Sequence, residues 1–238
     1  MVETLSGEEF FAKKRDFSPL LVHLTKDDFD YEGEFAIPAK DVLDSILSEK
    51  TLRAFNHFCL FSTNLAESQD ISLQDKFKVV CFTETPLGQI DALLQPLLGR
   101  WYQPGSYGLV FEKKFIREMG GNLVFYVTRD VAEPLWKLYW KVKKNEFPEK
   151  LHKSACRMLA LVTLCDNTSD WHWEREWRIV GDLKFTRQQV YCGICPESNI
   201  PYFSNEYFPI KFIDPYWRRD RIIRELVKQK VDDIPFYD

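Results

Sequence analysis

Strand-like and helix-like segments follow one another without the regular alternation that a doubly wound parallel sheet requires. Apolar, β-branched runs predict strands at 19–25, 77–83, 107–111, 123–127, 189–194 and 210–213. Helical spacing predicts helices from Pro38, from Pro86 with Thr85 as cap, at 112–119, over 132–165 and at 218–230. Because helices separate some strands and only loops separate others, we expect an α+β fold with a mixed or antiparallel sheet.

The chain gives no sign of internal division into separate domains. It has 238 residues, of which 45% are hydrophobic and 15% aromatic, which is ample apolar mass for one thick core. No repeat, Gly/Ser linker or low-complexity block interrupts it. We therefore predict a single domain over 1–238 that ends in a basic helix.

Charge and cysteine content narrow the class of protein. A net charge of −4 argues against electrostatic binding of nucleic acid over the whole protein surface, although a local basic groove is still allowed. The first residues lack a secretory pattern, and the apolar run at 158–165 is far shorter than the roughly 20 residues of a membrane helix. The 6 cysteines are then expected to be reduced thiols, which predicts a cytoplasmic protein that does not enter a membrane.

The segment from Trp173 to Ile179 alternates strictly between two kinds of side chain. In a strand, its aromatic residues would point one way while Glu174, Glu176 and Arg178 would share the other face. That charged face is either an ordinary exposed surface with cross-strand ion pairs or the lining of a cleft. From the residues alone, both interpretations stay open.

Other single residues carry weaker signals. His23 lies near the exit of the first strand, Tyr107-Gly108 enters a later one, and Thr83 stands at a strand-to-helix junction. A hydrogen-bonded histidine and a glycine that serves only the backbone explain the first two equally well.

The Cys192-Gly-Ile-Cys195 segment does not predict a metal centre. A structural zinc ion needs four ligands, and no second Cys-x-x-Cys or regular histidine pair completes the set. There is also no phosphate-binding loop of the Walker type, no glycine-rich dinucleotide turn and no Gly-x-Ser-x-Gly elbow. We therefore assign no metal ligands, although the fold could recruit Cys156, Cys165, His152 and His172 to complete a zinc site with Cys192 and Cys195.

Two basic stretches, 136–144 and 217–230, mix Lys and Arg with Trp and other apolar residues. This composition suits either a solvated helix face or a surface that follows a phosphate backbone and stacks bases.

Three segments in order resemble a known group of proteins. They are Val-Val-Cys-Phe-Thr-Glu-Thr-Pro-Leu at 79–87, Tyr-Gly-Leu-Val-Phe-Glu-Lys-Lys-Phe at 107–115 and Glu-Arg-Glu-Trp-Arg at 174–178. Together they resemble the AbiGi-like abortive-infection proteins of bacteria, which confer phage resistance. That group is distantly similar to ADP-ribosyltransferases of the DarT and diphtheria-toxin type.

The resemblance implies an ADP-ribosyltransferase-like fold and an NAD site. It implies that His23 holds the adenosine-side ribose, that Tyr107 or Phe82 packs on nicotinamide, and that Glu176 is the catalytic carboxylate. Thr25 and Thr83 join the cofactor-binding set because they lie beside these positions. Glu174 could replace Glu176, and Arg178 would bind a phosphate or hold Glu176 in place.

The leading hypothesis is an NAD-dependent ADP-ribosyltransferase effector of a phage-defence or toxin–antitoxin system. Its acceptor would be a macromolecule, with RNA or DNA favoured over protein, and its partner a cognate antitoxin or defence protein. One alternative is a non-catalytic antitoxin or partner-binding protein. Another is a metal-dependent nuclease that uses Glu174 and Glu176, with Glu84 available as a further acid.

Overall fold

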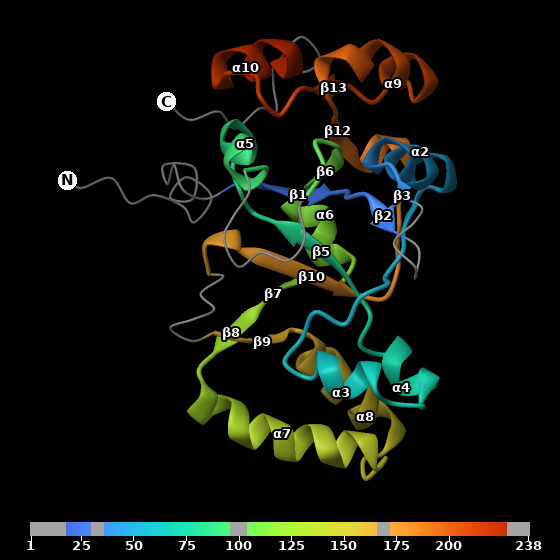
Figure 1. Ribbon diagram of the computed structural model, residues 1–238, viewed down its shortest axis with the longest axis vertical. Helices are drawn as coiled ribbons and strands as arrows, with labels where there is room; N and C mark the ends of the chain where they lie inside the picture. Colours follow the sequence, from blue (N-terminus) through green and yellow to red (C-terminus); the bar gives the residue numbers. More distant parts are fainter. Residues whose placement is uncertain (1–17, 30–35, 96–103, 166–171, 228–238) are drawn as a thin grey trace, which may run out of the picture. The chain divides into compact units, whose positions relative to one another are not determined.

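The computed structural model describes residues 18–29, 36–95, 104–165 and 172–227, and its described parts combine helices with mostly antiparallel strands (Figure 1). This confirms the expected α+β class. The chain separates into two compact units, each assembled from non-contiguous segments. Unit 1 contains 1–50, 84–115 and 185–238, and unit 2 contains 51–83 and 116–184. That the whole chain forms one domain stays a prediction.

Unit 1 is built on four hydrogen-bonded strands. β1 (Leu20–Leu24) pairs antiparallel with β6 (Gly108–Glu112), and β6 pairs antiparallel with β12 (Val190–Ile194). β13 (Phe212–Ile213) joins β12 in parallel. A separate short pair joins β2 (Asp28–Phe29) to β3 (Ala36–Ile37). The sheet is therefore mixed, as its strand order predicted.

The helices of unit 1 are short, and their apolar residues pack on this sheet. They are α2 (Ala39–Glu49), α5 (Ile90–Leu93), α9 (Ile200–Glu206) and α10 (Arg219–Val227), with 3-10 turns η1 (Leu87–Gln89), η3 (Arg187–Gln189) and η4 (Glu197–Asn199). One core cluster contains strand residues Val22, Val110 and Ile194 together with Ile90 and Ile222 from α5 and α10. Val22 and Val110 thus point to one face of β1 and β6, which apolar side chains cover. The residues on either side of them in each strand point to the other face.

Unit 2 centres on β10 (Glu176–Val180), which lies between two antiparallel neighbours. These are β5 (Val79–Thr83) and β7 (Asn122–Leu123). Two further short pairs join β4 (Thr51–Leu52) to β11 (Leu183–Lys184) and β8 (Phe125–Val127) to β9 (Val162–Leu164). The first is antiparallel and the second parallel.

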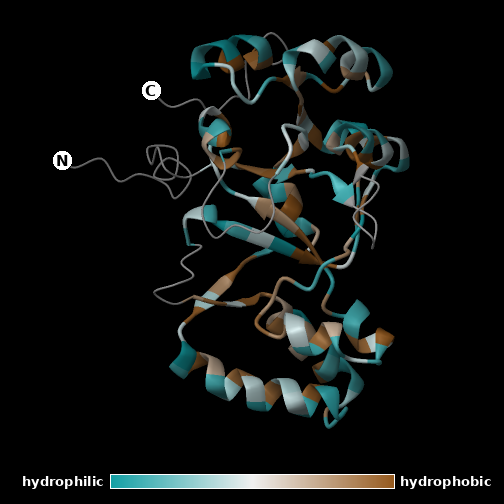
Figure 2. Ribbon diagram, viewed as in Figure 1, coloured by the Kyte–Doolittle hydropathy of each residue, from teal (hydrophilic) through white to brown (hydrophobic). Residues whose placement is uncertain are grey.

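Four helices supply the core of unit 2. They are α3 (Ser62–Ala66), α4 (Ile71–Asp75), α7 (Arg129–Lys143) and α8 (Glu149–Ala160), while α6 (Lys113–Glu118) spans the boundary between the units. The stacked rings of Phe61 and Tyr139, 4.6 Å apart, lie in this core with Leu159 and Phe77. Figure 2 shows hydrophilic and hydrophobic residues on the same turns of α7, as expected of a helix with one buried face.

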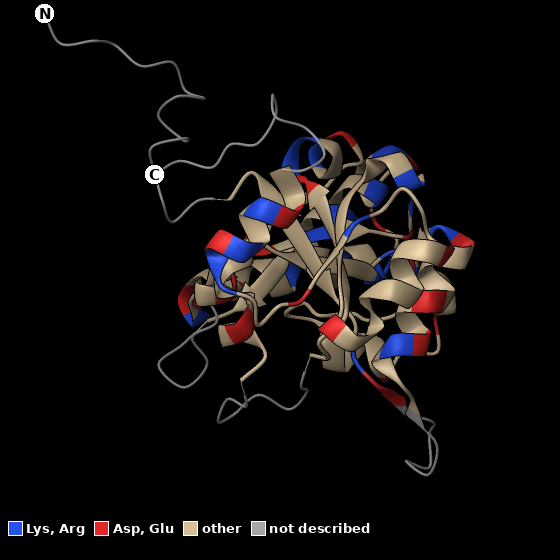
Figure 3. Cartoon of the chain, turned by 90° about the horizontal axis from the view of Figure 1, so that it is seen from above, with Lys and Arg blue, Asp and Glu red and all other residues tan. Residues whose placement is uncertain are grey.

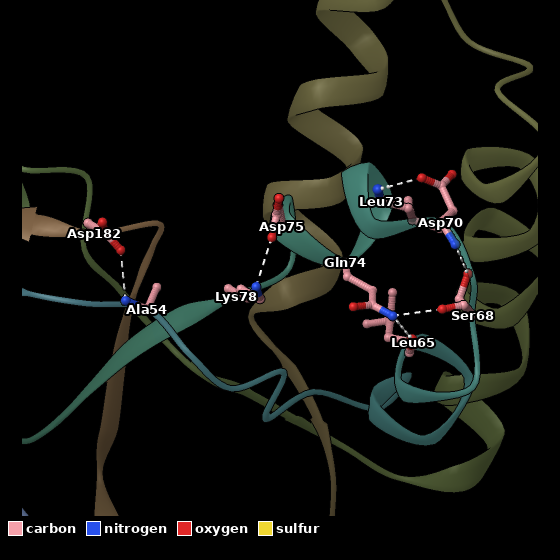
Figure 4. A network of polar contacts seen from close by, with 9 residues as sticks. All are labelled: Ala54, Leu65, Ser68, Asp70, Leu73, Gln74, Asp75, Lys78 and Asp182. Carbon is pink, nitrogen blue, oxygen red and sulfur yellow. Dashed lines mark hydrogen bonds and ion pairs between the residues drawn. The ribbon is translucent and has the colours of Figure 1, made fainter.

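Polar contacts fix the short helices α3 and α4 (Figure 4). Asp70 caps α4 by accepting a hydrogen bond from the Leu73 backbone, and the Gln74 amide donates to the carbonyls of Leu65 and Ser68. These bonds satisfy backbone groups that such short helices leave open.

The predicted strand from Trp173 to Ile179 is wrong at its beginning. Residues His172–Glu174 form the 3-10 turn η2, and Arg175 has a φ of 45°, so the strand begins at Glu176. Left-handed backbone cannot continue a β-ladder, and therefore Glu174 does not share a strand face with Glu176. Trp173 is also exposed rather than part of a buried aromatic face.

Other boundaries differ for local reasons. The predicted strand at 123–127 is split into β7 and β8 because Val124 hydrogen-bonds to Glu176, whereas Phe125 hydrogen-bonds to Leu161. Thr85 is not a helix cap, since Pro86 precedes η1 without a side-chain cap. The expected helical region to 165 ends in β9, and the terminal helix is described only to Val227.

Within the described ranges, no helix is long and apolar enough to cross a membrane.

Candidate functional site

Glu176 and Arg178 lie on the same face of β10 and form a buried ion pair. Arg178 Nε donates to Glu176 Oε1 over 2.8 Å, and Nη2 donates to Oε2 over 2.7 Å. The exposed fractions of the Arg178 and Glu176 side chains are 2% and 14%. The two parallel bonds hold the carboxylate in one orientation, as is typical of a bidentate arginine pair. Of the two interpretations left open by the sequence, an ordinary exposed surface does not fit Arg178, because its side chain is buried.

The surroundings of Arg178 keep it charged. Its Nη1 donates to the Ala160 carbonyl over 3.1 Å. Burial lowers the pKa of Arg178, but the charge and hydrogen bonds of Glu176, together with Cys81 and Cys59, outweigh burial, so the pKa lies above its ordinary value. Cys81 stands opposite Arg178 in the strand register. Burial, and next the charge of Glu176, raise the pKa of the Cys81 thiol well above its usual value, so this thiol stays protonated.

Tyr126 on β8 brings a buried hydroxyl to the same region. Its proton has no acceptor among the described residues, while the backbone N–H of Glu176 lies close enough to lower its pKa. Burial raises the pKa of Tyr126, and the charges of Glu176 and Glu174 raise it further, so the phenol keeps its proton at neutral pH. A buried donor without an acceptor is uncommon in folded proteins. The carboxylate of Glu176 and the hydroxyl of Tyr126 therefore give unit 2 one fixed acceptor and one unused donor.

Glu174 and Thr83 meet beside this pair through the backbone. Thr83 Oγ1 donates to the Glu174 carbonyl oxygen over 2.6 Å, and Thr83 is the register partner of Glu176. Phe82 alternates to the opposite face, where it pairs with Trp177, and it is buried. The structure thus brings Thr83, Glu174, Glu176 and Arg178 together and places Phe82 away from them.

The remaining predicted residues lie in unit 1, where they also form a group. The backbone N–H of Thr25 donates to the Tyr107 carbonyl over 2.8 Å, and His23 pairs with Leu109 in the register of β1 and β6. Strand alternation puts His23, Thr25 and Tyr107 on one face. The Thr25 hydroxyl is buried within 3.0 Å of the Ala39 carbonyl and 3.2 Å of the Tyr107 carbonyl, so it holds the backbone together.

A hydrogen bond from Asn199 fixes the phenol of Tyr107. Asn199 Nδ2 donates to the Tyr107 hydroxyl over 2.8 Å, and burial raises the pKa of Tyr107. The adjacent Gly108 allows close approach of the strands, because an added Cβ would lie 2.4 Å from the His23 carbonyl oxygen. Close approach of the two strands therefore explains why residue 108 is a glycine. This explanation concerns Gly108 alone and says nothing against a binding role for Tyr107.

No matching family model, curated protein or solved structure was found for this chain.

Among the residues that the structure describes, no cluster of three or more His, Cys, Asp or Glu side chains is placed to hold a metal ion. Glu84, the acid considered for a nuclease, is buried in unit 1 and accepts a hydrogen bond from Lys113 Nζ over 2.5 Å. Cys192 and Cys195 are buried, and burial raises the pKa of both thiols.

Sequence reasoning did not identify Tyr126 as a site residue, and it considered the neighbouring Cys165 and His172 only as residues that a zinc site could recruit. The ring centroid of Tyr126 lies 4.7 Å from that of His172, and the sulfur of Cys165 lies 3.3 Å from His172 Nδ1. The apolar run at 123–127 predicted a strand there, but it gave no hint of what the tyrosine would face.

Proposed function

We propose that the chain is an NAD-dependent ADP-ribosyltransferase-like effector of a bacterial phage-defence or toxin–antitoxin system, with an ADP-ribosyltransferase-like fold. The observation that supports this most is the orientation of Glu176 by Arg178 near the buried hydroxyl of Tyr126. In this proposal Glu176 is the catalytic residue, and Arg178 is a positioning residue.

The proposed chemistry uses a fixed negative charge. As the bond between nicotinamide and ribose breaks, positive charge develops on the ribose ring, which a carboxylate stabilises. Each Glu176 oxygen receives one hydrogen bond from Arg178, and a carboxylate oxygen has room for another. Glu176 can therefore accept a hydrogen bond from a ribose hydroxyl without releasing Arg178.

Most of the residues expected to bind the cofactor keep a proposed role, and one does not. His23 and Tyr107 stay proposed NAD contacts, with Thr25 holding their strands together, and Thr83 supports the backbone of Glu174. Phe82 is no longer proposed, because it lies on the sheet face opposite Glu176.

The proposed acceptor is a macromolecule, with RNA or DNA favoured by the helices of unit 2. Residues 129–160 contain 8 Lys and Arg against 4 Asp and Glu, a net charge of +4 within a chain of −4. Trp140 is exposed there, and Lys143 Nζ lies 5.1 Å from the center of its ring. In Figure 3, by contrast, charges of both signs are interspersed over the described helices, so attraction would be local rather than general.

The test is incubation of the full-length protein with labelled NAD and, separately, with RNA, DNA and protein from bacterial cells. Covalent label on RNA or DNA supports the proposal in full. Label on protein alone supports the activity and overturns the favoured acceptor. No label in any of the three, with a folded protein, contradicts the proposed activity.

A second candidate is a non-catalytic antitoxin or partner-binding protein, which exposed aromatic side chains in unit 1 favour. Phe208, Tyr216 and Tyr202 are 75%, 58% and 47% exposed, which is unusual for large apolar rings. This candidate predicts no NAD turnover and a loss of partner binding after Phe208→Ser.

A further inference from the structure

Unit 2 contains two cysteine–histidine pairs of different character. The sulfur of Cys156 lies 3.7 Å from His152 Nδ1, and the sulfur of Cys165 lies 3.3 Å from His172 Nδ1. Both distances suit a hydrogen bond to sulfur, so geometry alone permits proton sharing in either pair. Their surroundings determine which thiol can react.

The Cys156–His152 pair is closed to proton transfer. His152 Nε2 lies 3.0 Å from the Val142 carbonyl oxygen, which can only accept, so Nε2 carries the proton of the neutral ring. Nδ1 then accepts from the Cys156 thiol. Both side chains are buried. Burial raises the pKa of Cys156 to about 11, so this pair is structural.

The Cys165–His172 pair lies in a different setting. His172 is exposed to water, and Cys165, although buried, keeps 8% of its surface accessible against 1% for Cys156. The Cys165 backbone N–H donates to the Val127 carbonyl over 2.8 Å, which fixes the residue at the end of β9.

Charged groups surround the Tyr126 side chain that packs against His172. The Tyr126 ring packs against His172, and the Tyr126 hydroxyl feels the negative charges of Glu176 and Glu174 and the positive charge of Arg178. Arg178 is already engaged by Glu176, while Glu174 is only two positions from His172. An imidazolium at His172 can in turn stabilise a thiolate at Cys165.

We propose that Cys165, supported by His172, is a modification site at which the thiolate reacts with peroxides. The Cys165 sulfur attacks one oxygen of hydrogen peroxide, and the O–O bond breaks. The departing hydroxide takes the proton of the His172 imidazolium and leaves as water. The product is the sulfenic acid of Cys165, with sulfur oxidised by two electrons and the peroxide reduced. This site is independent of the proposed transferase activity.

The experiment compares cysteines within one folded protein. The full-length protein is treated at neutral pH with limiting iodoacetamide, and the alkylation rate of each cysteine is measured by peptide mass spectrometry. Cys165 is expected to react at least about 10-fold faster than Cys156, which serves as the internal control. A parallel sample receives hydrogen peroxide and then dimedone, which labels sulfenic acid. Dimedone label is expected on Cys165 and not on Cys156.

Two matched variants test whether His172 activates Cys165 or whether Cys165 reacts faster only because it is more exposed than Cys156. His172→Gln is expected to slow alkylation of Cys165 about 10-fold, whereas His152→Gln should leave the Cys165 rate unchanged. Circular dichroism checks folding, and His172→Asn replaces a His172→Gln protein that does not fold. Equal rates at Cys165 and Cys156, or a Cys165 rate unaffected by loss of His172, would overturn the proposal. So would the absence of dimedone label on Cys165.

Discussion

Arg178 grips both carboxylate oxygens of Glu176, two positions before it on β10, while it also donates to the Ala160 carbonyl. This arrangement makes a long charged side chain one of the largest fully buried residues of the protein. A charge in that position depends on its partner, because each would be uncompensated without the other.

Arg178→Met is therefore expected to destabilise the protein by about 3–5 kcal/mol, since Glu176 is left buried without its cation. Urea unfolding measures the loss. The matched control is Lys78→Met, which removes an exposed ion pair with Asp75 at 2.8 Å and should cost no more than about 1 kcal/mol. Equal effects of the two substitutions would contradict the dependence of Glu176 on Arg178.

Gly108→Ala is expected to destabilise unit 1 by about 1–3 kcal/mol, because the new methyl group would meet the His23 carbonyl oxygen and the Leu24 side chain. Gly88→Ala is the control. Its methyl group would lie 3.3 Å from the Arg219 Cβ, a contact that a shift of a few tenths of an ångström relieves, so a change within about 1 kcal/mol is expected. Thermal unfolding of both variants checks the prediction, and a Gly108→Ala protein as stable as wild type would refute it.

The free energy of unfolding should fall at high pH because the buried Cys59 thiol loses its proton there. Burial raises the pKa of Cys59 to about 11 from 9.0, so the unfolded chain loses this proton first. The contribution is complete below pH 9 and is lost as the pH rises through about 11, by up to about 2–3 kcal/mol. Urea unfolding under reducing conditions at pH 8 and pH 11 measures the fall. Cys59→Ser, which has no titrating thiol, should show a smaller fall than wild type.

The elements that sequence predicted well have clear local signals. β1, β5 and β6 are apolar, β-branched runs, and α2 begins directly after Pro38. These signals arise within a few neighbouring residues, so no knowledge of the tertiary fold is needed to interpret them.

The site was predictable only in part, because its key contacts are not local. Alternation correctly placed Glu176 and Arg178 on one face, yet it could not show that Arg175 turns left-handed and removes Glu174 from the strand. The burial of Arg178 depends on the end of α8, where Ala160 receives its hydrogen bond. Tyr126 and His172 meet only because distant segments fold together.

The central claim is that the Glu176 carboxylate drives ADP-ribosyl transfer from NAD. The most direct measurement is the initial rate of label transfer from NAD by wild type, Glu176→Gln and the control Glu112→Gln, which changes an exposed carboxylate at the end of β6. Thermal unfolding of each protein confirms that the compared samples are folded, and Tyr126→Phe provides a second variant beside the same carboxylate. We predict that Glu176→Gln lowers the rate about 100- to 1000-fold while Glu112→Gln leaves it unchanged. Undiminished transfer by folded Glu176→Gln would contradict the assignment of Glu176 as the catalytic residue.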